Sequence, residues 1–168
     1  MEQTVTSSTT KGVVIGLILV IFALITYFLD IQTAGYLQFI SYIILIAGVI
    51  WSVIIYGKQI DYNSTFGNYF AHGFKVAALV TCIMIIYVII FSLLFPEFKE
   101  KALQKTAEEM QKRNLSQDQI SQTLKIWDKL FMVFIIGGTL LMNLIAGAIA
   151  SLIGAGVTKK NPHPFVEG

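Results

Sequence analysis

Four long runs of apolar residues constrain this chain more than any other feature of its sequence. They cover residues 12–29, 35–56, 74–95 and 130–157, and none has a charged residue in its interior, since Lys75 lies at the start of the third. A helix needs about 20 apolar residues to cross a hydrocarbon core roughly 30 Å thick. In lipid every backbone polar group must be satisfied within the segment, so each run is predicted to be a membrane-spanning helix.

The composition agrees with lipid as the solvent of this chain. Of its 168 residues 55% are hydrophobic and 13% are charged, whereas a soluble domain has about 25% charged residues. The net charge is only +2 and no basic stripe appears, so we expect no nucleic-acid partner. The predicted fold class is an all-α membrane protein with four transmembrane helices in a single domain, residues 1–168, and the lipid bilayer is its first predicted partner.

The shorter connections are predicted from their length and residue types. Residues 1–11 are polar and are expected to fray, and residues 30–34 are short enough for a tight turn. Residues 57–73 contain aromatic side chains three to four positions apart, as on one face of an interfacial helix. These residues are Tyr62, Phe66, Tyr69 and Phe70, followed by Phe74. Aromatic side chains at headgroup level are ordinary membrane anchors, and a ligand-binding aromatic patch is the alternative.

The third connection, residues 97–129, is long and carries seven basic and six acidic side chains. The pair Asn114–Leu115 interrupts a first helical segment, and Ser116 with Gln119 three residues later is typical of a capping box that opens a second. No helix breaker follows, so we predict one long helix from Ser116 to Val157. The connection is therefore predicted to be an extramembrane helical hairpin between the third and fourth spans.

Apolar side chains on both predicted arms support this hairpin. The second arm has a stripe at helical spacing, formed by Ile120, Leu124, Trp127 and Phe131. The first arm would pack against it through Phe98, Leu103, Ala107 and Met110. Charged residues on the remaining faces are interpreted as a solvated helix surface.

The distribution of lysine and arginine gives a split indication of orientation. Four spans place both termini on one side, together with Lys11, Lys58, Lys75, Lys159 and Lys160, while the seven basic residues of the third connection lie on the other. Cytoplasmic loops carry an excess of Lys and Arg. The first turn has neither, and Lys159–Lys160 directly follows the last span, so we expect cytoplasmic termini.

The sequence lacks the residues that membrane enzymes and ion-coupled carriers use. No ionisable group lies at mid-depth of a span, which argues against a proton-coupled carrier. His72 and His163 are far apart in sequence, and no cluster has the spacing of metal ligands. Cys82 lies within the third run and is interpreted as a hidden structural thiol. We therefore expect no enzymatic activity, no cofactor and no metal.

Small residues at helical spacing remain as candidate contact positions. Gly12 and Gly16 form a GxxxG pair in the first span, and Gly147, Ser151 and Ala155 recur every four residues in the fourth. Such residues let helices approach closely in lipid, either inside the bundle or against an external partner. In the same helix Asn143 can hydrogen-bond across an interface, a contact worth about 0.6–2 kcal/mol.

Short motifs spread over nearly the whole chain resemble a known family. They include Thr65-Phe66-Gly67 and Gly73-Phe74-Lys75 before the third span, and Pro96-Glu97-Phe98 after it. Leu115-Ser116-Gln117-Asp118-Gln119-Ile120 and the Lys159-Lys160 tail complete the pattern. The chain resembles the domain-of-unknown-function 4199 family of small membrane proteins of Gram-negative bacteria. That resemblance implies four spans and an inner-membrane location, and it brings no activity, cofactor or catalytic residue.

Three functional hypotheses follow. The first is a non-enzymatic accessory or scaffold subunit that acts through helix–helix contacts and its hairpin, with a protein partner or a second copy of itself. The alternative is a small homo-oligomeric channel or permease lined by Ser, Thr, Asn143 and glycine backbone. The third is a lipid-headgroup-binding protein in which His72 and Lys75 contact the headgroups.

Overall fold

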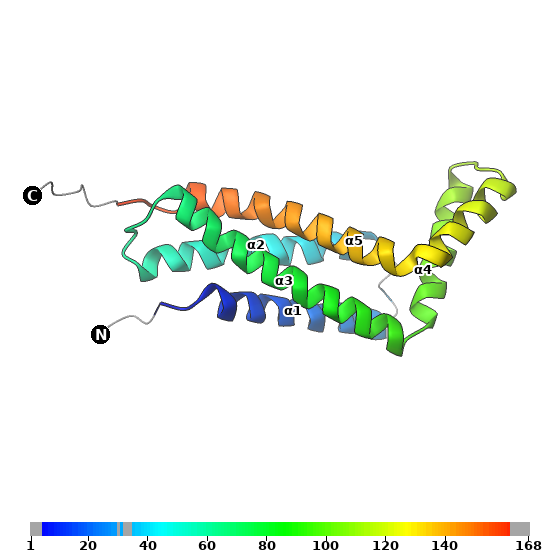
Figure 1. The fold of residues 1–168 in the computed structure, drawn as a ribbon, viewed down its shortest axis with the longest axis horizontal. Coiled ribbons are helices and arrows are strands. Elements are labelled where there is room, and N and C mark those ends of the chain that lie inside the picture. Colours follow the sequence, from blue (N-terminus) through cyan, green and yellow to red (C-terminus); the bar gives the residue numbers. More distant parts are fainter. Residues whose placement is uncertain (1–4, 30, 32–34, 162–168) are drawn as a thin grey trace, which may run out of the picture. The chain divides into compact units, whose positions relative to one another are not determined.

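The computed structural model describes residues 5–29, 31 and 35–161, and this part of the chain is helical without a strand (Figure 1). The helices are α1 (Ser8–Phe28), α2 (Gly35–Gln59), α3 (Phe66–Leu94), α4 (Glu97–Lys112) and α5 (Gln117–Val157). Four of them, α1, α2, α3 and α5, are long and apolar enough to cross a membrane. The helices therefore indicate a multi-pass membrane protein. Most of the predicted turn at residues 30–34, and His163 in the tail, lie outside the described residues.

The chain divides into two compact units, which are described separately. Unit 1 comprises residues 1–84 and 141–168, and unit 2 comprises residues 85–140. Unit 1 contains α1, α2, the first part of α3 and the last part of α5. Unit 2 contains the last part of α3, all of α4 and the first part of α5.

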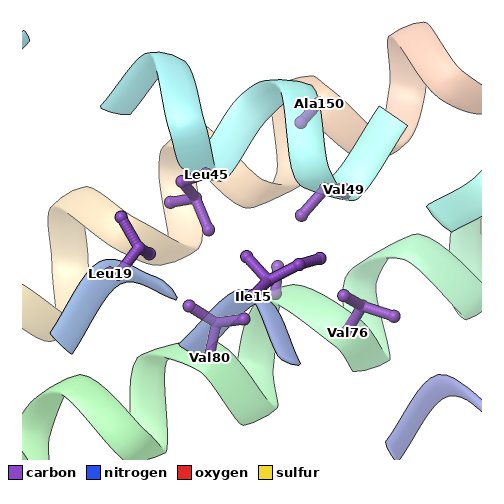
Figure 2. Close-up of a cluster of buried hydrophobic side chains, with 8 residues drawn as sticks. Ile15, Leu19, Leu45, Val49, Val76, Val80 and Ala150 are labelled. Atoms are coloured by element: carbon purple, nitrogen blue, oxygen red, sulfur yellow. The ribbon is translucent and has the colours of Figure 1, made fainter. Parts of the chain in front are cut away.

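The core of unit 1 is a cluster of aliphatic side chains contributed by all four of its helices. In Figure 2, Ile15 of α1 lies among Leu45 of α2, Val76 and Val80 of α3, and Ala150 of α5. These positions recur at helical spacing along their own helices, so each helix presents one face to the same centre. Burial of this cluster brings the four helices together.

The outward faces of the same helices are also apolar. Ile21 of α1 is 55% exposed, Phe39 of α2 is 70% exposed and Leu141 of α5 is 60% exposed. Soluble proteins rarely expose contiguous apolar surface of this extent. In a hydrocarbon environment, exposed apolar side chains carry no free-energy cost of contact with water. The exposed apolar faces therefore agree with the four candidate spans.

Chain segments that are distant in sequence meet at one end of unit 1. The backbone N–H of Thr6 donates to Gln59 Oε1 (3.1 Å). The backbone N–H of Asn161 donates to the carbonyl oxygen of Tyr62 (2.9 Å). Residues 6 and 161 therefore lie at the same end as the connection between α2 and α3, as an even number of spans requires.

Contacts between α4 and the first part of α5 help to hold unit 2 together. Lys99 forms a salt bridge with Asp128 (2.8 Å), and the Phe98 ring meets the ring of the buried Phe131 edge to face. No side chain of α4 is fully buried. The residues of α4 are therefore either exposed or half-buried.

Local sequence signals explain how α4 ends and α5 begins. Asn114 adopts a left-handed conformation (φ 58°), and the N–H of Leu115 donates to the Met110 carbonyl, which together form a Schellman C-cap. The predicted capping box is confirmed. Gln119 Oε1 accepts from the Ser116 N–H (3.0 Å), and the Gln119 N–H donates to Ser116 Oγ (3.3 Å).

Replacing Ser116 with alanine should weaken the start of α5 by about 1 kcal/mol, because one amide of the first turn loses its side-chain acceptor. Faster hydrogen exchange confined to the first turn of α5 is the expected result. Gln122→Ala, an exposed change one turn further on, is the control. If the first turn of α5 exchanges hydrogen equally fast in Ser116→Ala and in Gln122→Ala, the Ser116 side chain does not cap the helix.

Two predicted boundaries are corrected by the structure. α3 begins at Phe66, so the aromatic segment assigned to an interfacial connection forms the first turns of the spanning helix. Tyr69 in that segment is wholly buried, because it packs against Tyr56 of α2. α1 begins at Ser8 behind the N-cap Ser7, so Lys11 belongs to the helix and not to a frayed leader.

One further prediction is confirmed with a local difference, and another is wrong. The long helix from Ser116 to Val157 is present as α5, but it has a kink at Leu130 (φ −107°, ψ 16°). No proline or glycine causes this kink; it falls between Asp128 and Phe131, which are both held by contacts to α4. Cys82 is exposed on α3 and is not hidden, because it lies on the outward, lipid-facing side of an apolar helix.

Candidate functional site

The glycine pair of α1 lies against α3. A Cβ added to Gly12 would stand 2.9 Å from Leu79 Cδ2, and one added to Gly16 would stand 2.7 Å from Ile83 Cδ1. Real Cβ atoms do not approach other atoms so closely. The absence of a side chain at these two positions therefore allows α1 and α3 to pack as closely as they do. Inside unit 1 these glycines act as contact positions between helices.

The small residues of α5 face the interior of unit 1. Gly147 meets Ala77 of α3 so closely that an added Cβ would overlap its methyl group. Ser151 is buried, and its hydroxyl donates to the Gly147 carbonyl (2.6 Å). Ala155 belongs to a second buried cluster with Val53 and Tyr69. This face of α5 is therefore covered by α2 and α3.

Asn143 is half-buried in α5. Its predicted hydrogen bond across a helix interface stays a prediction.

His72 and Lys75, which the sequence suggested together as headgroup contacts, point to different surroundings. His72 is 9% exposed, and its ring stacks on the Tyr56 ring with the centroids 4.1 Å apart and the planes at 6°. Lys75 is exposed. Three residues apart on α3, the two side chains do not converge on one point.

A buried polar cluster forms around Lys11 instead, at the end of unit 1 where Thr6 and Gln59 meet. Lys11 is only 3% exposed, and its ammonium group donates to the Ser52 carbonyl oxygen (3.4 Å) and to Gln59 Oε1 (3.3 Å). It also lies 5.7 Å from the centroid of the Tyr56 ring. We define the Lys11 cluster as Lys11, Ser52, Tyr56, Gln59, Tyr69 and His72.

Three polar atoms in this cluster find no hydrogen-bond partner within the described residues. They are Ser52 Oγ, Tyr69 OH and His72 Nε2. An unsatisfied buried polar group costs about 1–3 kcal/mol, and such groups are rare in folded proteins. Two other buried hydroxyls behave differently, since Thr81 and Thr158 donate to carbonyls one turn earlier, whereas Ser92 Oγ of unit 2 also lacks a partner among the described residues. The Lys11 cluster thus has unused hydrogen-bonding capacity.

The charge around this cluster is one-sided. Among the described residues of unit 1 there are five lysines and a single acidic residue, Asp61. Lys58 lies in the last turn of α2, and Lys159 and Lys160 directly follow α5. Lys11 is the one lysine of the five that is buried. The arrangement favours a negatively charged ligand.

Sequence reasoning missed Lys11 because it was counted with the polar leader. The signal was present, however: Lys11, Ile15 and Leu19 recur every four residues, and all three face inward. A lysine on the buried stripe of a spanning helix indicates a functional or structural polar site. Over residues 5–29, 31 and 35–161, no three His, Cys, Asp or Glu side chains gather in a way that could hold a metal ion.

A family model described as "Protein of unknown function (DUF4199)" matches residues 10–160, which is most of the chain. The chain belongs to the DUF4199 family. The resemblance seen in the sequence motifs is thereby confirmed. No curated protein and no solved structure matches this DUF4199 member significantly. The family description carries no activity, so the function has to be argued from the residues themselves.

Proposed function

We propose that this DUF4199 protein is a non-enzymatic accessory or scaffold subunit of the bacterial inner membrane. In this proposal both termini lie in the cytoplasm. α4 and the first part of α5 form a helical hairpin outside the bilayer, and a protein partner binds this hairpin. The observation that carries the proposal is the open, charged surface of α4, none of whose side chains is fully buried.

The packing of unit 1 supports this division of roles. The small-residue faces of its helices are covered by neighbouring helices of the same chain. Gly16 packs against Ile83, and Gly147 packs against Ala77. These positions therefore serve the bundle, and a partner must use other surfaces. Unit 2 offers such a surface outside the apolar runs.

A groove in unit 2 borders this surface, where the apolar runs of α3 and α5 meet α4. It has a volume of about 340 Å³ and lies between the end of α3 and the facing parts of α4 and α5. Its walls include Leu93 and Val133, both exposed, and the Lys99–Asp128 salt bridge. Apolar walls beside a polar rim suit a protein segment, because protein interfaces combine an apolar centre with a polar edge. Seven basic against six acidic residues in this region argue against a purely electrostatic partner.

Photo-crosslinking in native membranes tests this proposal. A crosslinking amino acid is placed at Gln104 or at Glu108, two exposed positions one turn apart on α4. The expected result is one and the same partner protein at both positions, recovered in stoichiometric amount. The control is Ile43, an exposed position on α2 that should crosslink to lipid only. An α4 surface that captures no protein, or different proteins at the two positions, would contradict the scaffold role.

A homo-oligomeric channel is the second candidate, and one observation favours it. Gly137 and Gly138 of α5 have no neighbour within 4 Å, so a helix from a second copy could approach closely there. A disulfide between two copies carrying Gly138→Cys, together with ion or solute flux through reconstituted vesicles, would favour the channel over the scaffold.

A further inference from the structure

We propose that the Lys11 cluster is a binding site for a phosphate group, supplied by the headgroup of an anionic phospholipid. This inference goes beyond the scaffold role. Its ligand is a phosphate group and not a protein, and its site lies in unit 1 and not in unit 2. It rests on the buried ammonium group, on the unpartnered polar atoms beside it and on the excess of lysines at the same end of unit 1.

The ammonium group of Lys11 needs a negative charge. Its two hydrogen-bond acceptors, the Ser52 carbonyl and the Gln59 amide, are both neutral. Asp61 is the one carboxylate among the described residues of unit 1, and it is exposed. Withdrawing a charge from water costs several kcal/mol unless an opposite charge and further hydrogen bonds compensate for it. A bound anion would supply both.

The unpartnered atoms provide the donors that a phosphate group requires. Tyr69 is fully buried, and its hydroxyl can donate, as can the hydroxyl of the fully buried Ser52. His72 Nε2 can donate in the tautomer that carries its proton there. Phosphate oxygens accept several hydrogen bonds at once, and charge-assisted bonds are the strong ones.

The Lys11 ammonium group and the rings of His72 and Tyr69 all lie around the Tyr56 ring. The Lys11 ammonium group lies 5.7 Å from the centroid of this ring, and the stacked His72 ring lies 4.1 Å from it. The Tyr69 ring meets it edge to face at 6.0 Å. Ser52 lies one turn before Tyr56 on α2. The cation and the donors thus surround a single side chain.

Two members of the cluster, Tyr56 and Gln59, keep part of their side chains exposed. Gln59 is tied to Thr6 by two hydrogen bonds, Thr6 N–H to Oε1 (3.1 Å) and Nε2 to Thr6 Oγ1 (2.9 Å). Rotation of Gln59 would admit a headgroup without breaking a helix. The exposed lysines Lys58, Lys159 and Lys160 would attract it, as basic pockets between spanning helices attract anionic lipid.

Lipid titration of the full-length protein in mild detergent tests the proposal. Phosphatidylglycerol, phosphatidylcholine and inorganic phosphate are added separately, and binding is followed by native mass spectrometry and by the thermal unfolding midpoint. Wild-type protein should bind phosphatidylglycerol in preference to phosphatidylcholine. Lys11→Met should weaken phosphatidylglycerol binding at least tenfold. Lys75→Met, which removes an exposed lysine on α3, should change it less than twofold.

Tyr69→Phe keeps the test valid if Lys11→Met does not fold. This change removes only a hydroxyl that has no partner, so the unfolding midpoint in lipid-free detergent should stay the same or rise, while phosphatidylglycerol binding weakens at least threefold. If inorganic phosphate binds in a Lys11-dependent manner and the lipid does not, the phosphate site stands and its ligand is free phosphate. Binding that is unchanged in the Lys11 and Tyr69 variants, or equally reduced by Lys75→Met, would overturn the proposal.

Discussion

Gly147→Leu should destabilise the helical bundle by about 3 kcal/mol, near the upper end of the cost of overpacking a core. The Cβ alone would overlap the methyl group of Ala77, and the rest of the leucine side chain has no space between α5 and α3. Thermal unfolding of the purified protein in detergent measures the effect. The variant should unfold at a clearly lower temperature or fail to give monodisperse protein.

Two further variants separate this steric effect from a general effect of changing a glycine. Gly156 lies on the same helix with no atom within 4 Å of its would-be Cβ, so Gly156→Leu should stay within about 0.5 kcal/mol of wild type. Gly147→Ala should be rescued by Ala77→Gly, which removes the methyl group that it meets. If Gly147→Leu leaves the unfolding temperature unchanged, or if Ala77→Gly does not rescue Gly147→Ala, then α3 and α5 do not pack through this pair.

Phe131→Ala should loosen unit 2 while leaving the core of unit 1 folded. Phe131 is one of the few buried side chains of unit 2, and it contacts both the Phe98 ring and the Lys99 side chain. Truncating a buried phenylalanine costs about 3–5 kcal/mol. We expect α4 to lose most of its hydrogen-exchange protection and to become sensitive to protease, since no side chain of α4 is itself fully buried.

The control for Phe131→Ala is Val133→Ala, two residues further along α5 at an exposed position. It should leave the protection of α4 unchanged. If Phe131→Ala also leaves α4 protected, the contact between α4 and α5 is not what orders this segment. Loss of protection throughout unit 1 would show that the two units do not unfold separately.

The positions of the helices could be predicted from the sequence more accurately than the residues that each helix turns toward the bundle. Long uncharged runs have one stable state in lipid, and the capping box at Ser116 marks a helix start through hydrogen bonds within four residues, so both could be recognised from sequence alone. The beginning of α3 at Phe66 could not, because Tyr69 and His72 are drawn into the bundle by Tyr56 of another helix. The kink at Leu130 has no proline or glycine to mark it in the sequence.

The candidate site was harder to predict than the fold. Small residues in a spanning helix indicate that something lies close by, but they do not distinguish Ala77 of the same chain from a partner. The buried position of Lys11 was visible in its spacing from Ile15 and Leu19. What spacing could not show is that Ser52, Tyr69 and His72 gather beside it, since these residues come from two other helices. Cys82 shows the same limit, because an apolar run has both a lipid side and a protein side.

The central claim, that the chain crosses the membrane four times, is tested most directly by labelling single cysteines with a membrane-impermeant maleimide in a Cys82→Ala background. Lys58→Cys and Lys159→Cys probe one end of unit 1, and Gln104→Cys probes α4; all three positions are exposed. With four spans, Gln104→Cys should react from one side of the membrane, and Lys58→Cys and Lys159→Cys should react only from the opposite side. Reaction of all three positions from the same side would contradict the claim of four spans.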